Sequence, residues 1–199
     1  VFGELITPES LLVRREGDDL ILSVIGGTDE LRVAEGLTTR QIEEFIFADG
    51  TIWTPAEIRE ELLRGTDGAD RLTGFDNRDD VLDGGLGSDV LEGLDGNDTY
   101  SFEIGYGSDS ISDTGGVDRI EFGDLITPQN ISFAEDDGNL VIRFAGADDT
   151  LVILDALVSS SAAIETLAFA DGSEIDLSTI LTGLIERQAT AGSDVVLGT

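Results

Sequence analysis

Short runs of alternating apolar and polar residues occupy the first 64 residues of the chain. This alternation is typical of β-strands that bury one face. It predicts strands at Leu11 to Val13, Leu20 to Ile25, Leu31 to Val33, Glu44 to Phe47 and Thr51 to Trp53. The polar turn from Glu16 to Asp19 joins the first two into a β-hairpin.

The same kind of pattern returns after residue 118. It predicts strands at Ile131 to Phe133, Asn139 to Phe144, Thr150 to Leu154 and Ile164 to Phe169. The turn from Asp136 to Asn139 separates the first two of these. The chain is therefore expected to be mainly β, with two β-rich modules at residues 1–64 and 119–190.

One short helix closes each module. The first has an N-cap threonine, a proline at N1 and an acid at N3, in Thr54, Pro55 and Glu57. It is predicted to end at Leu63 or Arg64, before Gly65. The second is predicted from Thr179 to Arg187, capped by Asp176 or Ser178.

The two modules also repeat one another in sequence. Three segments of the first match three of the second in the same order: Phe2 to Ser10 with Phe122 to Asn130, Gly17 to Gly26 with Gly138 to Gly146, and Ile42 to Trp53 with Ile164 to Ile175. We therefore expect a tandem array with a unit of about 120 residues. In this array, residues 1–64 end one unit and residues 191–199 begin a further repeat region.

Between the modules, Gly65 to Tyr100 follows a different pattern, in which an aspartate precedes a large apolar residue by two positions. The pairs are Asp70 with Leu72, Asp80 with Leu82, Asp89 with Leu91 and Asp98 with Tyr100, and Asp109 with Ile111 restores the pattern later. Glycines precede each aspartate and allow sharp turns with positive φ. A unit with one apolar position in nine cannot bury a core alone, so stacking of neighbouring units is expected.

This pattern resembles the calcium-binding RTX nonapeptide GGxGxDxUx, where U is large and apolar. The flanking modules resemble the haemolysin-type calcium-binding related domain, in which an F-A-D-G turn recurs. The resemblance implies a parallel β-roll at residues 65–118, with calcium between the turns of successive coils. It implies metal ligands at Asp70, Asp80, Asp89, Asp98, Asp109, Thr66, Gly68, Gly85, Gly87 and Gly96.

The family geometry places the ligand aspartates in pairs two repeats apart. Carried onto this chain, it pairs Asp70 with Asp89, Asp80 with Asp98, and Asp89 with Asp109. Calcium takes six to eight oxygen ligands from carboxylates and carbonyls, which suits such turns. The second repeat, Gly74 to Asp83, has one extra residue and fewer glycines, so a poorer site is expected at Asp80.

The net charge of −31, from 42 acidic and 11 basic residues, argues against nucleic acid and anionic membranes as partners. No apolar run reaches the roughly 18 residues of a membrane helix, and no N-terminal signal peptide is visible. A chain of this charge repels itself, and multivalent cations would relieve the repulsion.

Composition also limits the available chemistry. The chain has no His and no Cys, and all its basic residues are arginine, which excludes a Ser-His-Asp triad, a thiol nucleophile, a lysine Schiff base and nitrogen- or sulfur-ligated zinc. No EF-hand loop is present. A carboxylate pair for glycoside hydrolysis is conceivable, but the periodic aspartates already have an explanation. We therefore expect no enzymatic activity.

These observations favour a calcium-binding structural module of a large, secreted, bacterial tandem-repeat protein of the RTX type, an adhesin or exoprotein. The resemblance implies type I secretion, folding outside the cell on binding calcium, and neighbouring repeats of the same chain as partners. One alternative is a calcium-dependent folding and secretion module of a secreted hydrolase, protease or epimerase. Another is a carbohydrate-binding module, in which Trp53 and Tyr106 line a surface for a glycan or cell-surface ligand.

Overall fold

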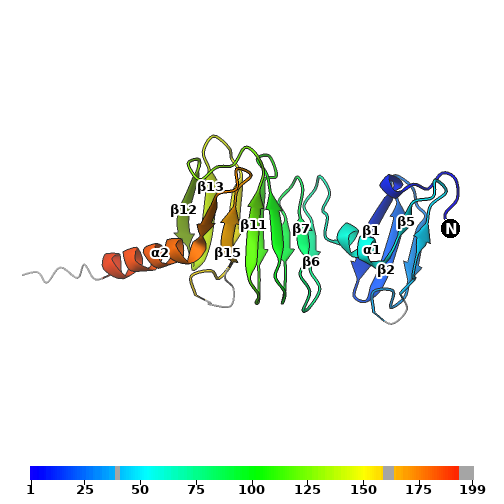
Figure 1. The fold of residues 1–199 in the computed structure, drawn as a ribbon, viewed down its shortest axis with the longest axis horizontal. Helices are drawn as coiled ribbons and strands as arrows, with labels where there is room; N and C mark the ends of the chain where they lie inside the picture. The colour runs from blue at the N-terminus through cyan, green and yellow to red at the C-terminus, as the bar shows by residue number, and fades with distance from the viewer. Residues whose placement is uncertain (39–40, 159–163, 193–199) are drawn as a thin grey trace, which may run out of the picture. The chain divides into compact units, whose positions relative to one another are not determined.

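The computed structural model describes residues 1–38, 41–158 and 164–192 of the chain. It divides into two compact units, Val1–Leu62 and Leu63–Thr199 (Figure 1). Strands make up most of the described regular structure, and the predicted mainly-β class is confirmed. Residues 193–199, for which the start of a further repeat region is predicted, lie outside the described residues, while residues 191 and 192 end a helix.

The first unit is built on a three-stranded antiparallel sheet in the order β1-β2-β3. A short 3-10 turn, Pro8–Ser10, leads into β1 (Leu11–Glu16), β2 (Asp19–Val24) and β3 (Glu30–Val33). The predicted hairpin is confirmed, since Glu16 pairs with Asp19 across a turn in which Gly17 has a φ of 62°. A second hairpin, of β4 (Phe45–Ile46) and β5 (Ile52–Trp53), completes the strands of this unit.

The aromatic residues of the first unit belong to its core. Phe45 and Phe47 are buried, and the ring of Trp53 meets that of Phe47 edge-on at 4.9 Å. Trp53 is only 7% exposed, so it cannot line a glycan-binding surface. The other proposed lining residue, Tyr106, lies in the second unit, where it packs edge-on against Phe102.

Helix α1 (Pro55–Leu62) starts as predicted. The Thr54 backbone N–H donates to Glu57 Oε2 at 2.9 Å, and the Ala56 N–H donates to Thr54 Oγ1 at 3.3 Å, so the N-terminal cap is formed. The helix ends one or two residues earlier than the sequence predicts. The reason is tertiary, because Leu63 is buried in the core of the second unit and Arg64 pairs with Asp83.

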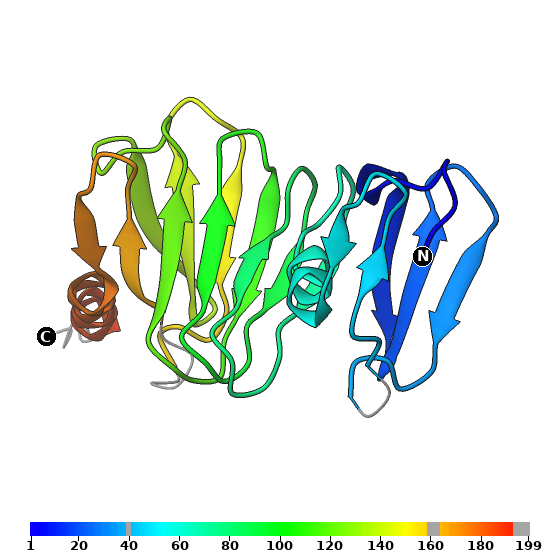
Figure 2. The same ribbon diagram turned by 45° about the vertical axis from the view of Figure 1, so that its right-hand side comes forward.

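The second unit begins with residues 63–122, in which short strands joined by turns wind round in successive turns of a coil, so that consecutive strands lie alternately in two sheets. We call this segment the coil. Strands β6 (Arg71–Thr73), β8 (Val90–Glu92) and β10 (Ser108–Ser112) lie in one sheet, and β7 (Val81–Asp83), β9 (Thr99–Phe102) and β11 (Asp118–Phe122) in the other. All neighbouring coil strands are parallel. Figure 2 shows these strands side by side.

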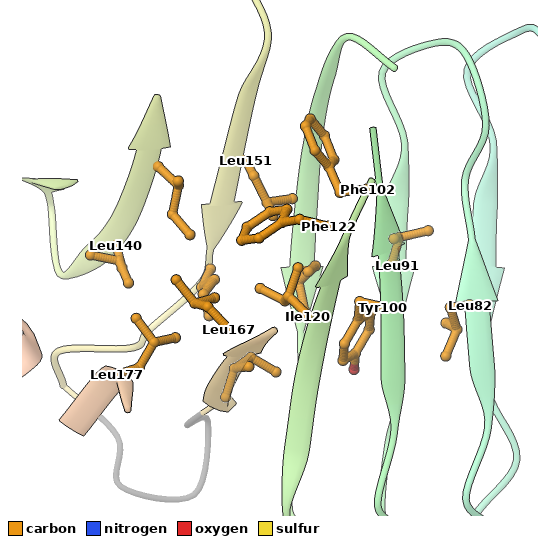
Figure 3. Packing of buried hydrophobic residues seen from close by; sticks show 14 of the residues in the cluster. Leu82, Leu91, Tyr100, Phe102, Ile120, Phe122, Leu140, Leu151, Leu167 and Leu177 are labelled. Atoms are coloured by element: carbon orange, nitrogen blue, oxygen red, sulfur yellow. The ribbon is translucent and has the colours of Figure 1, made fainter. Parts of the chain in front are cut away.

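The register of the coil follows the apolar position of each repeat. Leu72 pairs with Leu91, and Leu91 with Ile111, while Leu82 pairs with Tyr100, and Tyr100 with Ile120. These side chains are buried, and Figure 3 shows Leu82, Leu91, Tyr100 and Ile120 among the packed side chains of the core. The one apolar residue of each repeat therefore supplies the core of the coil, as the pattern predicts.

The second module extends both sheets of the coil. Strand β14 (Thr150–Ile153) pairs with β10 and continues through β13 (Asn139–Phe144) to β12 (Ile131–Asp136). Strand β15 (Ile164–Ala168) pairs with β11 and carries β16 (Glu174–Asp176) at its outer side. One sheet thus has six strands and the other five.

The coil and the second module share one core, so the predicted boundary at residues 118/119 does not separate two domains. It falls inside β11, whose Ile120 and Phe122 pair with β9 on one side, while the same strand pairs with β15 on the other. Helix α2 (Leu177–Gly192) follows β16 and contacts β15 and β12. It begins two residues earlier than predicted, because Asp176 Oδ1 accepts the Ser178 N–H at 2.9 Å and so caps it.

The register predicts which leucines stabilise the coil. Leu82 and Leu91 are 0% and 1% exposed, so Leu82→Ala or Leu91→Ala should each lower the free energy of unfolding by about 2–5 kcal/mol. Leu86, which occupies a variable repeat position and is 45% exposed, provides the matched control Leu86→Ala. Denaturant unfolding followed by circular dichroism measures the three values. Equal losses at all three positions would show that the register is wrong.

Candidate metal centre

The turns of the coil form two stacked rows. The first row holds the turns that end at Asp70, Asp89 and Asp109, and the second row holds those that end at Asp80, Asp98 and Asp118. Neighbouring turns within a row are held by backbone pairing, as between Gly87 and Gly107. Each row therefore places its aspartates one above another, at the entrances to successive strands of one sheet.

Glycine is required where the turns touch. Gly85, Gly87 and Gly96 have φ values of 75°, 143° and 150°, which side-chain-bearing residues rarely adopt. A Cβ atom on Gly87 would lie 2.7 Å from the carbonyl oxygen of Gly68, and one on Gly85 would lie 2.8 Å from that of Thr66. On Gly96 it would lie 1.7 Å from the carbonyl oxygen of Arg78. The turns thus stack closely enough for backbone oxygens to face the next turn.

A ladder of aspartates links the turns of each row. The backbone N–H of one aspartate donates to Oδ1 of the aspartate in the next turn. The distances are 2.8 Å from Asp70 to Asp89, 2.9 Å from Asp89 to Asp109, 2.8 Å from Asp80 to Asp98 and 2.7 Å from Asp98 to Asp118. The structure therefore brings together every aspartate pair implied by the resemblance to the RTX repeat.

In four of these aspartates, called the inner aspartates, the second carboxylate oxygen has no hydrogen-bond partner among the described residues. This holds for Oδ2 of Asp89, Asp98, Asp109 and Asp118, and each of these residues is at most 2% exposed. A buried carboxylate oxygen without a partner is costly, because burial removes it from water without replacing the lost interactions. Four such atoms, at equivalent positions of successive turns, mark places where a cation could bind.

The first turn of each row differs. Asp70 Oδ2 accepts hydrogen bonds from the Thr66 N–H at 2.7 Å and the Thr66 hydroxyl at 2.8 Å. Asp80 Oδ2 accepts the Phe75 N–H at 2.6 Å. These two carboxylates already have partners within their own turns, so they have less need of a cation than the inner four.

Three carboxylates meet in the second row. Asp98, Asp113 and Asp118 are buried, and one oxygen of each lies within 4.8 Å of the others. The Tyr100 hydroxyl donates to Asp113 Oδ2, and the Gly115 N–H donates to Asp113 Oδ1 at 2.9 Å. A Cβ atom on Gly93 would lie 2.4 Å from Asp98 Oδ2 and 2.5 Å from Asp113 Oδ2, so only glycine leaves room for this cluster.

The electrostatics of the inner carboxylates favour neutralisation. Burial raises the pKa of Asp98 to about 6, and the nearby charges of Asp113 and Asp80 act in the same direction. Burial likewise raises the pKa of Asp109 to about 6, with the charge of Asp89 adding to it. Burial also raises the pKa of Asp118, assisted by Asp113 and Asp98. A bound divalent cation would offset this repulsion and desolvation.

Only oxygen ligands are available in these turns, and the chain contains neither His nor Cys. Carboxylates and backbone carbonyls bind hard cations such as calcium. The residues that the RTX resemblance implies as ligands offer carboxylate, hydroxyl and carbonyl oxygens, which fit this chemistry.

Two carboxylates of the cluster, Asp113 and Asp118, are not among the metal ligands expected from the sequence. Asp118 follows Asp109 by nine residues and precedes Ile120 by two, so the repeat signal was present there. Asp113 lies outside the Asp-x-apolar pattern and joins the site because it begins the turn that ends at Asp118, which stacks on the turn of Asp98. Asp83 has the equivalent place in the first row, where its Oδ1 accepts the Gly85 N–H at 3.2 Å.

The raised pKa values predict an unusual pH dependence. Above these pKa values the carboxylates are ionised and destabilise the folded coil, whereas protonation between about pH 7 and 5 relieves this. With divalent cations removed, the melting temperature should therefore rise on acidification by at least about 3 °C, corresponding to roughly 1 kcal/mol. With excess divalent cation the trend should reverse, since protons compete with the cation.

A pair of double variants separates the inner carboxylates from the general charge of the chain. The rise in melting temperature on acidification should be mostly lost in the double variant Asp98→Asn/Asp118→Asn. It should be kept in Asp124→Asn/Asp137→Asn, which makes the same change in charge at exposed positions. Thermal unfolding followed by circular dichroism checks both. A melting temperature of the parent chain that is constant or falls on acidification without cations would contradict the prediction.

Comparison with known proteins supports a calcium-related assignment. None of the curated proteins compared with the chain matches it. In the described part of the chain, no helix is long and apolar enough to cross a membrane. The family described as haemolysin-type calcium binding protein related domain matches residues 19–57 and 139–179, one region in each module. The predicted resemblance to this family is thus confirmed, since two regions of the chain match its model.

Proposed function

We propose that this chain is a non-catalytic, calcium-binding structural module, in which residues 63–122 form a parallel β-roll stabilised by calcium between stacked turns. The observation that carries the proposal is the set of four buried aspartate Oδ2 atoms without partners, at equivalent positions of successive turns. The family match of both modules supports calcium as the cation.

Different residues of the chain would bind the ions of the two rows. Asp98, Asp113 and Asp118 would hold an ion in the second row, and Asp89 and Asp109 would hold one in the first. The carbonyl oxygens that face the next turn at these places, such as those of Gly87 and Gly96, would complete an all-oxygen shell. Calcium supplies the positive charge that these buried carboxylates otherwise lack.

The same chemistry supports a proposal for the biological setting. Folding of a chain of charge −31 with paired, buried carboxylates is disfavoured where calcium is scarce and favoured where calcium is plentiful, as outside the cell. We therefore propose a secreted, extracellular tandem-repeat protein of the RTX type, such as an adhesin or exoprotein, with type I secretion. A role as the folding module of a secreted enzyme is the alternative, and it would make the same use of calcium.

Calcium should control folding of the coil. Chelation at neutral pH should lower the melting temperature of the coil and reduce its far-UV circular dichroism signal, because binding restricted to the folded state contributes directly to its stability. Titration should restore it with a Kd of about 10⁻⁴–10⁻³ M, as in other extracellular calcium modules. Magnesium provides the control cation, since it is smaller and dehydrates reluctantly. A spectrum and melting temperature unaffected by chelator would refute the proposal.

The two rows should not be equally sensitive to substitution. Asp89 stands in the middle of its row, bonded to Asp70 on one side and Asp109 on the other, with Oδ2 lacking a partner. Asp80 begins its row, and the Phe75 N–H donates to its Oδ2. Asp89→Ala should therefore lower the calcium affinity and the number of bound ions more than Asp80→Ala does.

Titration calorimetry on the two variants decides this ranking. Helix α1 should remain intact in both, because its N-terminal cap is formed by Thr54 and Glu57 without any contribution from the coil. A loss of binding in Asp80→Ala as large as that in Asp89→Ala would overturn the ranking of the two sites.

A further inference from the structure

The two modules are equivalent in detail as well as in sequence. In the first, the Glu35 N–H donates to Asp19 Oδ1 at 2.9 Å, and in the second the Asp155 N–H donates to Asn139 Oδ1 at 2.9 Å. Glu35 and Asp155 both have a φ of 55°. The two regions of the family match start 120 residues apart, at residues 19 and 139. Strand β3 therefore corresponds to β14, and β4 to β15.

In the second module, β14 attaches the module to the coil. The Thr150 N–H donates to the Gly107 carbonyl and the Leu154 N–H to the Ile111 carbonyl, both at 2.9 Å. The contact buries Leu151 and Ile153, which are each 1% exposed. The β14 edge is thus fully used in binding the last strand of its sheet in the coil.

Two carboxylates of the second module end the aspartate ladders. Asp149 accepts the N–H groups of Gly105 and Gly107 at 3.0 and 2.9 Å. Glu165 Oε2 accepts the Asp118 N–H at 2.7 Å, in the way that each coil aspartate accepts from the aspartate before it. These acids satisfy the backbone donors that the last turn of each row would otherwise leave open.

The first module carries the same features without a coil beside them in the described residues. Its β3 is an edge strand, and Leu31, the equivalent of Leu151, is 43% exposed. Asp29 and Glu43, the equivalents of Asp149 and Glu165, are exposed. An edge strand with an exposed leucine, flanked by two acids at matching positions, is unfavourable in isolation and suited to a partner.

We propose that β3, β4, Asp29 and Glu43 form a docking edge that caps the last turns of a calcium-binding coil of the same type as residues 63–122. The kind of partner rests on the proposed function, whereas the docking edge rests on the contacts of the second module. Asp29 accepts backbone N–H groups from the last turn of one row, and Glu43 accepts one from the last turn of the other. Leu31 is buried against the core of that coil.

The chemistry of the edge favours a coil over a second copy of this module. A second β3 edge would add the acids Asp29, Glu30 and Glu43 of another copy to the same surface, and it would offer these carboxylates no turn of backbone donors. The glycine-rich turns of a coil offer backbone donors instead. The attachment point is also present, since the Phe2 N–H donates to the Ile46 carbonyl at 2.8 Å, and Phe2 corresponds in sequence to Phe122 at the end of β11.

The test extends the full chain by one coil. Residues 63–121 are repeated directly before Phe2, so that the added coil ends where Phe122 ends the existing one. Amide hydrogen exchange in calcium is measured at Glu30 and Ala34, the equivalents of Thr150 and Leu154. Both amides should exchange at least about tenfold more slowly in the extended chain than in the parent.

Matched variants of the extended chain test the two acids. Asp29→Ala/Glu43→Ala should lose most of the added protection, while Glu60→Gln, which removes an exposed charge on α1, should keep it. Unchanged exchange at Glu30 and Ala34 in the extended chain would overturn the docking edge. Protection of these amides in the parent chain that increases with protein concentration would overturn it in favour of a second copy.

Calcium stoichiometry, measured on the same samples, separates this inference from the proposed function. If the added coil binds calcium but Glu30 and Ala34 exchange as in the parent chain, the docking edge alone fails. If neither coil binds calcium, the proposed function fails, and slow exchange at the two amides still supports the docking edge.

Discussion

The structure of the coil depends on how each buried aspartate is satisfied. One oxygen accepts the N–H of the aspartate in the preceding turn, which fixes the register of successive turns. The other oxygen, in the inner four aspartates, has no partner within the described protein. Each of these side chains thus aligns the turns through one oxygen, while the negative charge on its other oxygen lacks a partner. Stacking of the turns and binding of a cation are therefore one interaction, and the stability of the coil should follow the cation.

The coil has a second constraint, because a stack of short parallel strands leaves open edges and open backbone donors at its ends. The second module meets this by adding β14 to one sheet and β15 to the other. It also places Asp149 and Glu165 where the aspartate ladders end. Consequently the module and the coil share one core and cannot be assigned to separate folding units. A module of this kind serves as an end cap for the rows of turns.

The sequence determined the elements and the register. The hairpin of β1 and β2, the N-terminal start of α1 and the inward position of Leu72, Leu82, Leu91 and Tyr100 all follow from local patterns. This is possible because turn glycines, N-caps and apolar periodicity act over a few residues. The end of α1 and the boundary after residue 118 were predicted wrongly, because Leu63 and β11 are placed by the core of the second unit and not by their neighbours in sequence.

The candidate site was likewise predicted in part from the sequence and decided in part by the tertiary structure. The repeat spacing located the aspartates, and the resemblance to the RTX family, with two repeats in each coil, implied that Asp70, Asp89 and Asp109 stand in one row and Asp80 and Asp98 in the other. Only the tertiary structure decided which oxygens are left without partners, since this depends on the hydrogen bonds of Thr66 and Phe75 within single turns. It also brought in Asp113, which lies outside the Asp-x-apolar pattern and whose carboxylate meets those of Asp98 and Asp118 because neighbouring turns stack on one another.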